Sequence, residues 1–441
     1  MTCVTLDVPR DYDRPTGATL TITAVIVPAS TSRPAPDPLL VLAGGPGESA
    51  TNLGRMPLVT EARRERDVIL FDVRGTGLSG PLHCDLIGPL SLTEDNALPP
   101  GDFARVQDVA TRCAAELGDR VRYHTDREVV EDIERFRRVR GYRAWNIIGL
   151  SYGTRIAQHY LRDYGESVRS VILDTVTPVG TSLLVNGGLS PDAALAKVLT
   201  QCAADSSCAA AFPDLPAKLE RLLTAAAGKP IVTRVAHPQT AEQTTFVLSY
   251  STLAGIVRFA LYSRQATELL PYAIDAAANG NFTPLLGISS VGLSIESIEL
   301  GMQFSTLCAG DWPSARDAGA AARTGHLMRD GFYESYNAAC KVWPQARLPA
   351  RMLRPFSSNV PALAISGEWD PVTPPADAEH ALRQFSTSVH LVVPHGPHGN
   401  SQDPCVLKII SSFLVDPIAG GRDHACVATM PAVHFMTGPS T

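Results

Sequence analysis

The sequence predicts an α/β protein, with a mostly parallel sheet covered by helices on both faces and interrupted by a large, mainly helical insertion. Short buried strands alternate with helical patterns up to about residue 180. This alternation is absent from 181–350 and returns at 361–366 and 389–393. Strands that are buried on both faces and separated by helices are typical of parallel sheets. We therefore expect a core formed by 1–180 and 351–441, and a helical cap domain at 181–350.

The N-terminal region predicts the first four strands. Residues 3–8 and 18–27 alternate apolar and polar side chains, which indicates two antiparallel strands joined by a turn over 9–17. Two short, wholly apolar runs follow, Leu39–Leu42 and Val68–Phe71, and each runs directly into a glycine-containing segment. Runs of this length and composition are typical of strands in the interior of a sheet.

The remaining elements follow from the same periodicities. Apolar residues that recur every three or four positions predict helices, and short β-branched runs that end near glycine or proline predict strands. The expected helices are 103–117, 126–140, 152–163, 191–203, 215–227 and 404–414, and the further strands of the core are 146–148, 171–173, 361–366 and 389–393.

Length, charge and hydropathy exclude several classes of protein. The chain has 441 residues, a net charge of −6 and 45% apolar residues. Two structural units are the usual expectation for this length. A sequence-independent nucleic-acid binder would be basic, and a membrane span needs about 18 consecutive apolar residues, which the chain lacks. We therefore expect neither nucleic acid nor a membrane span, and we expect no cofactor.

The nine cysteines predict disulfides and no metal. There is no CxxC and no Cys/His cluster with zinc-finger spacing. Eight of the cysteines fall into neighbouring pairs, whereas Cys3 is left over. Disulfides would place the protein in an oxidising compartment, secreted or periplasmic. The alternative is a cytoplasmic protein with buried thiols, because the chain starts directly with a strand and shows no signal peptide. The expected pairs are Cys84–Cys113, Cys202–Cys208, Cys308–Cys340 and Cys405–Cys426.

A GxSxG motif at Gly149–Gly153 identifies Ser151 as a candidate nucleophile. The motif follows an apolar strand and opens a helix, which is the context of a nucleophile elbow in the α/β-hydrolase fold. The flanking glycines allow a tight turn, and the helix N-terminus favours developing negative charge. A purely structural Gly/Ser turn is the competing interpretation.

A serine nucleophile needs a base and a group that orients the base. In this architecture the acid and then the histidine follow the serine along the chain. Asp370 comes after the strand at 361–366, and we favour it over Glu368 and Asp174. His398 follows the last strand and precedes a glycine, and we favour it over His395.

Two backbone N–H groups are expected to form an oxyanion hole. One belongs to Tyr152, directly after the serine, and the other to Gly45 in the loop after the strand at 39–42. Phosphate binding by this glycine-rich loop is disfavoured, because the loop lacks the Lys-Ser/Thr of a P-loop and the GxGxxG spacing.

Four motifs resemble the α/β-hydrolases related to prolyl and tripeptidyl aminopeptidases. The resemblance extends over nearly the whole chain. It implies that Ser151, Asp370 and His398 form a catalytic triad under a helical cap. It also implies an exopeptidase, commonly secreted, that removes residues from peptide N-termini. The motifs are Gly44–Gly47 (GGPG), Arg74–Ser79 (RGTGLS), Gly149–Arg155 (GLSYGTR) and Gly367–Pro375 (GEWDPVTPP).

Three positions depart from this family. Ala43 replaces the usual His before the GGPG motif, and Val73 stands where Gln is common. Gly310 stands where a cap segment often carries Glu, a natural partner for a substrate ammonium group. The carboxylates that could replace this Glu are Asp311, Glu296 and Glu299.

Three functions are compatible with these residues. The first is a serine aminopeptidase that acts on short peptides. The second is a carboxylesterase or amidase that acts on small-molecule esters by the same acyl-enzyme chemistry. The third, a binding protein that only retains the fold, is disfavoured because no triad member is missing. The expected partner is thus a short peptide or small ester, and the sequence predicts no particular oligomeric state.

Overall fold

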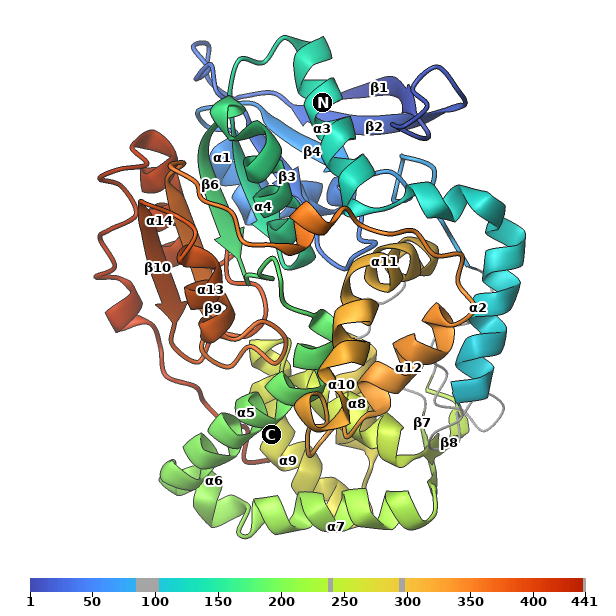
Figure 1. Ribbon diagram of the computed structural model, residues 1–441. Helices are drawn as coiled ribbons and strands as arrows, with labels where there is room; N and C mark the ends of the chain where they lie inside the picture. Colours follow the sequence, from blue (N-terminus) through green and yellow to red (C-terminus); the bar gives the residue numbers. More distant parts are fainter. Residues whose placement is uncertain (85–102, 237–240, 293–297, 439–441) are drawn as a thin grey trace.

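The protein is built on an eight-stranded, mostly parallel sheet (Figure 1). The computed structural model describes residues 1–84, 103–236, 241–292 and 298–438. The strand order is β1-β2-β4-β3-β5-β6-β9-β10, in which β1, β2 and β4 pair antiparallel and all later neighbours pair parallel. The strands are β1 (Thr2–Pro9), β2 (Thr19–Val27), β3 (Leu39–Leu42), β4 (Val68–Asp72), β5 (Trp145–Leu150), β6 (Val168–Asp174), β9 (Ala362–Gly367) and β10 (Ser388–Val393).

Helices cover both faces of the sheet, as β3 illustrates: all four of its residues are buried, and alternate side chains pack in different clusters. Leu40 packs in a cluster with α3 (Asp126–Arg140) and α4 (Tyr152–Tyr164). Leu39, one residue earlier, points to the opposite face and joins a cluster with α1 (Pro57–Ala62) and α14 (Pro404–Val415). Because neighbouring side chains of a strand point to opposite faces, wholly apolar strands require cover on both sides. Helix α13 (Pro375–Leu382) packs against β9 and β10.

A long segment between β6 and β9 is mainly helical and lies in the lower part of Figure 1. It has a hydrophobic cluster of its own, to which Trp369 and two residues of the C-terminal segment, Val433 and Phe435, also contribute. Its elements are α5 (Leu183–Ala204), α6 (Ser206–Ala211), α7 (Leu215–Gly228), β7 (Ile231–Ala236), β8 (Gln243–Leu248), α8 (Tyr250–Ala260), α9 (Arg264–Ala278), α10 (Thr283–Gly292), α11 (Leu300–Ala318) and α12 (Gly331–Cys340).

Four disulfides join the cysteines in the four neighbouring pairs that the sequence predicts, and Cys3 is free and exposed. The bridge Cys308–Cys340 joins α11 to α12, and Cys202–Cys208 joins α5 to α6. The bridge Cys84–Cys113 attaches α2 (Phe103–Leu117) to the segment that follows β4. The bridge Cys405–Cys426 ties the C-terminal segment to α14.

The structure differs from the sequence-based expectation at α5 and at the pair β7–β8, and it contains two further core helices, α1 and α13, that the local pattern does not predict. Helix α5 begins at Leu183, eight residues before the expected start at 191, and contains Pro191. The antiparallel pair β7–β8 lies within the segment that the sequence predicts to be mainly helical. Helix α2 lies at the expected residues, 103–117, and packs against α12 and α11 (Figure 1). The elements that differ depend on contacts between distant parts of the chain, which local periodicity does not encode.

Candidate active site

Ser151 lies in a sharp turn between β5 and α4. Its backbone has φ 50° and ψ −118°, a conformation that non-glycine residues rarely adopt. The turn is possible because glycines flank it: a Cβ on Gly149 would lie 2.5 Å from the Gly153 carbonyl oxygen, and a Cβ on Gly153 would lie 2.3 Å from the Leu42 oxygen. The Ser151 N–H donates to the Asp174 carbonyl oxygen at 2.9 Å. This geometry holds the hydroxyl at the carboxyl edge of the sheet.

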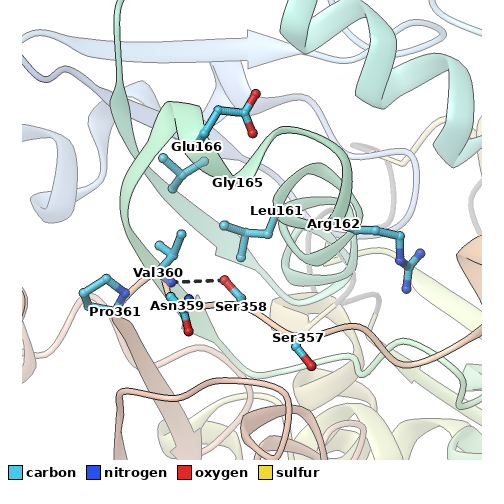
Figure 2. A pocket seen from close by; sticks show the side chains of 10 residues that line it. Leu161, Arg162, Gly165, Glu166, Ser357, Ser358, Asn359, Val360 and Pro361 are labelled. Atoms are coloured by element: carbon cyan, nitrogen blue, oxygen red, sulfur yellow. Dashed lines mark hydrogen bonds between the residues drawn. The ribbon is translucent and has the colours of Figure 1, made fainter.

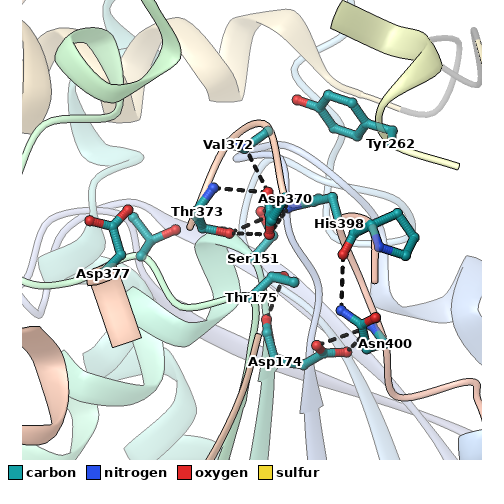
Figure 3. Close-up of polar contacts among 12 residues, drawn as sticks. Ser151, Asp174, Thr175, Tyr262, Asp370, Val372, Thr373, Asp377, His398 and Asn400 are labelled. Atoms are coloured by element: carbon teal, nitrogen blue, oxygen red, sulfur yellow. Dashed lines mark hydrogen bonds and ion pairs between the residues drawn. The ribbon is translucent and has the colours of Figure 1, made fainter. Parts of the chain in front are cut away.

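His398 links Ser151 to Asp370 in a continuous hydrogen-bonded chain (Figure 3). His398 Nε2 lies 2.9 Å from Ser151 Oγ, and His398 Nδ1 lies 3.0 and 2.9 Å from the two carboxylate oxygens of Asp370. Burial disfavours the charged imidazole, but the adjacent Asp370 carboxylate more than offsets this, so the pKa of His398 lies above its usual value. The histidine is therefore placed to accept a proton from the serine.

The loop after β9 fixes the Asp370 carboxylate. The backbone N–H groups of Val372 and Thr373 donate to Asp370 Oδ1 at 2.8 and 3.0 Å, and the Thr373 hydroxyl donates to Oδ2 at 2.8 Å (Figure 3). The Thr373 hydroxyl oxygen also lies 3.3 Å from His398 Nδ1. Donors of this kind favour the ionised carboxylate and hold its plane toward the imidazole.

The competing candidates from the sequence have other partners. The Asp174 carboxylate accepts the N–H groups of Asn400 and Ser401 and so anchors the loop that follows His398. The backbone N–H of His395 donates to Glu368 Oε2 at 2.8 Å, and the His395 ring packs against Trp369 with 4.7 Å between ring centroids.

The glycine-rich loop after β3 passes beside the serine. A Cβ on Gly44 would lie 3.0 Å from Ser151 Cβ, so a larger residue here would press on the serine. Gly45 has φ +102° and is followed by a cis peptide bond to Pro46. The loop pairs with the segment that precedes α11, where the Glu299 N–H donates to the Gly47 oxygen at 2.9 Å. Tyr152 directly follows Ser151 at the start of α4, and Gly45 directly follows Gly44 in the loop beside the serine.

Glu48, which the sequence analysis did not single out, places a carboxylate in the same site. Its Oε2 accepts the Gly44 N–H at 3.2 Å and would lie 3.3 Å from a Cβ on that glycine. Burial raises the pKa of Glu48, whereas Gly44 and the nearby His398 act in the opposite direction. In the sequence Glu48 is simply the residue after GGPG, and a signal appears only when the loop is folded against Ser151.

The three carboxylates predicted to bind a substrate amine have different surroundings. Asp311 is buried, pairs with Arg155 at 2.7 Å and accepts the Leu183 N–H at 2.6 Å. Its negative charge is thus already compensated inside the protein, which differs from the expected role. Glu299 lies next to the glycine-rich loop, with Oε2 3.2 Å from His83 Nδ1. Glu296 lies outside the described residues.

Tyr262, two residues after the C-terminal end of α8, brings the helical segment into contact with the catalytic histidine candidate. Its ring packs edge-on against the His398 ring, with 5.2 Å between centroids (Figure 3). Its hydroxyl accepts a hydrogen bond from Arg258 Nη2 at 2.8 Å. The site is therefore lined by two parts of the chain, the sheet edge and the helical segment.

A separate surface pocket lies away from this site (Figure 2). It is formed by the C-terminal end of α4, which includes Leu161 and Arg162, and by 357–361, just before β9. Ser151 precedes α4 and Asp370 follows β9, so the pocket lies at the opposite edge of the sheet from the hydrogen-bonded chain. In the part of the chain that the structure describes, no group of three His, Cys, Asp or Glu side chains could hold a metal ion.

Two family models match the chain. Residues 37–197 match the model described as alpha/beta hydrolase fold, and residues 326–426 match the model described as TAP-like protein. The fold and these matches define the chain as an α/β hydrolase, and it is therefore a hydrolytic enzyme. The match of the C-terminal part to the TAP-like model confirms the resemblance found in the sequence motifs.

The relatives support this assignment. Serine protease Hip1 of Mycobacterium tuberculosis is 24% identical over 94% of this chain and 85% of its own length. Tripeptidyl aminopeptidase of Streptomyces lividans is 24% identical over 96% of this chain and 83% of its own length. Carboxylesterase B of Mycobacterium tuberculosis is 30% identical over 47% of this chain and 42% of its own length.

Proposed function

We propose that this enzyme is a serine aminopeptidase that releases N-terminal residues or short peptides through an acyl-enzyme. The observation that carries the proposal is the hydrogen-bonded chain from Ser151 Oγ through His398 to Asp370. Relatives named serine protease and tripeptidyl aminopeptidase, which align over most of the chain, favour peptides as substrates.

The reaction follows from the roles that these atoms can take. As Ser151 Oγ attacks the scissile carbonyl, His398 Nε2 accepts its proton and then gives it to the leaving amine. Asp370 holds the Nδ1–H tautomer and stabilises the imidazolium. The N–H groups of Gly45 and Tyr152 donate to the oxyanion that forms in the tetrahedral intermediate. Water, activated by the same histidine, then hydrolyses the acyl-enzyme.

The helical segment acts as a cap over this site in the proposed enzyme, with boundaries near 181 and 350. Tyr262 against the His398 ring and the backbone pairing of Glu299 with Gly47 support that role. A cap of this kind excludes water from the reacting groups and restricts which substrates reach the serine.

An aminopeptidase must bind a charged α-amine near the scissile bond, and we assign that role to Glu48. A buried ammonium group without a counter-charge would be unfavourable by several kcal/mol. Glu48 is close to Ser151, and within the described residues its carboxylate accepts one hydrogen bond, from the Gly44 N–H. Glu299 is the second choice. Asp311 ranks after both, because Arg155 already neutralises it.

Paired substrates test the proposed function. The enzyme should cleave aminoacyl and tripeptidyl anilides with a free amine, whereas their N-acetylated forms should react at least tenfold more slowly. Glu48→Gln should raise KM for the free-amine substrates and leave the N-acetylated ones little changed, and Glu65→Gln, a control in the turn before β4, should behave like the wild type. Equal rates of cleavage of the free and the N-acetylated substrates would rule out the aminopeptidase function.

A carboxylesterase is the second candidate, because a relative of that name matches about half of this chain at 30% identity. The same triad would form an acyl-enzyme from an ester. Rapid hydrolysis of p-nitrophenyl esters, with no cleavage of either form of the anilides, would select this function.

The disulfides support a secreted or periplasmic location. Four bridges are stable only where the surroundings are oxidising. Within the described ranges, no helix is sufficiently long and apolar to span a bilayer.

A further inference from the structure

Arg258, on helix α8, is a buried cation without a carboxylate partner. The structure describes five buried arginines, and four of them pair with an aspartate. The fifth, Arg258, is only 7% exposed and forms no ion pair with any described residue. The four pairs are Arg66–Asp37, Arg74–Asp132, Arg155–Asp311 and Arg323–Asp330.

Aromatic rings hold the guanidinium in place but do not satisfy its donors. Its central carbon lies 5.4, 5.3 and 4.9 Å from the ring centroids of Phe259, Tyr262 and Phe332. Nη2 donates to the Tyr262 hydroxyl, whereas the buried Nε has no hydrogen-bond partner. Ring faces attract a cation, yet they cannot replace an acceptor for each N–H group, and an unpaired buried charge is costly.

Arg258 lies close to the reacting groups, because a single residue, Tyr262, separates it from His398. Tyr262, which accepts its hydrogen bond, packs directly against the His398 ring. Arg258 is also close enough for its charge to oppose protonation of His398. His398 delivers the proton to the leaving group, so a group bound next to His398 belongs to the leaving side of the substrate. An anion at Arg258 would therefore be carried by the leaving group.

We propose that Arg258 binds a carboxylate on the leaving group, and that the preferred substrates are short peptides whose free C-terminus lies close to the scissile bond. The proposal rests on the serine hydrolase chemistry proposed above, but not on the choice between peptide and ester. With Glu48 on the side of the glycine-rich loop, the site then presents a negative charge to the α-amine and a positive charge to the α-carboxylate. Such a site matches a small zwitterionic peptide.

The test compares leaving groups that differ only in the carboxylate. Ala-Ala and Ala-Ala-amide are the peptide pair, and 4-acetoxybenzoate and 4-acetoxybenzamide are the ester pair. A charge-assisted hydrogen bond predicts that the carboxylate forms react with a kcat/KM about ten- to a hundredfold higher in the wild type. Arg258→Met, which keeps the apolar stem, should reduce this ratio to about one. Arg329→Met is the matched control, because it removes another arginine that lies over an aromatic ring, that of Tyr250. It should keep the wild-type ratio.

The outcomes separate this inference from the proposed function. Preference for the carboxylate ester, with no cleavage of either peptide or of the free-amine anilides, supports the role of Arg258 and rules out the aminopeptidase. Cleavage of both peptides at equal rates in the wild type overturns the role of Arg258 and leaves the aminopeptidase intact; this measurement needs no variant to fold. The enzyme could instead prefer Asp-anilide over Asn-anilide and show no preference for Ala-Ala over Ala-Ala-amide. Arg258 would then bind a carboxylate on the acyl part of the substrate, and the proposal would be overturned.

Discussion

At the scale of single residues, His398 should control the pH dependence of the reaction. The imidazole must be neutral to accept the serine proton, and Asp370 holds its pKa above the usual value of about 6.5. The kcat/KM should therefore rise with pH and level off only above that higher pKa. Asp174 raises the pKa of His398 as well, whereas Arg258 lowers it. A pH–rate profile on one neutral ester measures this limb, and a flat profile between pH 5 and 8 would contradict the assignment.

Substitution separates the two histidines of the same loop. His398→Ala should lower kcat by several orders of magnitude, since triad groups act as a unit. His395→Ala should retain most of the activity, because the His395 ring packs on Trp369 and only its backbone N–H contacts Glu368. The measurement is kcat of both variants with the same anilide. A large loss in His395→Ala with little loss in His398→Ala would assign the base to His395.

The three triad candidates were accessible to sequence reasoning, but the charges around them were not. Ser151 belongs to a motif, and Asp370 and His398 each follow an apolar strand in the expected order. Glu48 and Arg258 carry no such pattern. Their importance depends on which opposite charge lies within reach, and this is decided by the packing of distant segments. Asp311 shows the converse: it is adjacent to a position of interest in the sequence, but the fold turns it toward Arg155.

At the scale of elements, the buried pair Arg155–Asp311 joins α4 of the core to α11 of the helical segment. Asp311→Asn would leave the guanidinium buried without its counter-charge and should lower the free energy of unfolding by about 3–5 kcal/mol. The pair Arg127–Asp13, in which Asp13 is exposed, is the control, and Asp13→Asn should leave the free energy of unfolding nearly unchanged. Denaturant unfolding of both variants gives the comparison.

Asp311→Asn also tests whether Asp311 binds the substrate amine, as the sequence predicts. If Asp311→Asn leaves stability unchanged and raises KM for free-amine substrates alone, Asp311 binds the substrate and Glu48 does not. If stability falls while the ratio of free to blocked substrates is retained, the carboxylate serves the junction between α4 and α11.

Element prediction succeeded where one local pattern sufficed. The wholly apolar β3 and β4 and the amphipathic α3 lie where their periodicity places them. The pair β7–β8 has a half-exposed, weakly alternating sequence, with burial that is largely intermediate, and gave no clear period. The first turns of α5 are hidden for a different reason: they precede Pro191, and an interior proline usually ends a helix.

At the scale of the whole molecule, covalent and noncovalent links hold the C-terminal segment across both parts of the chain. The bridge Cys405–Cys426 fixes it to α14 of the core. Beyond this bridge, the carbonyl oxygens of Pro431 and Ala432 accept hydrogen bonds from Arg264 at 2.8 and 2.9 Å, and the Met436 N–H donates to the Glu268 oxygen at 3.0 Å. Both arginine and glutamate belong to α9. The segment therefore restrains the helical part against the sheet.

The bridges should be present in the native enzyme and should contribute unequally to its stability. Alkylation of the unfolded, unreduced protein should label one cysteine, Cys3, and mass spectrometry of its peptides should find the other eight in the four pairs. In the chain-entropy model a bridge stabilises more when it closes a longer loop. Cys308–Cys340 closes 32 residues and Cys202–Cys208 closes 6, so the model gives about 4 and about 2 kcal/mol respectively. The double serine variant of the first pair should therefore lower the free energy of unfolding more than that of the second. Nine alkylated thiols in enzyme isolated without reductant would contradict the bridges, and with them the proposed secreted or periplasmic location, in favour of the cytoplasm.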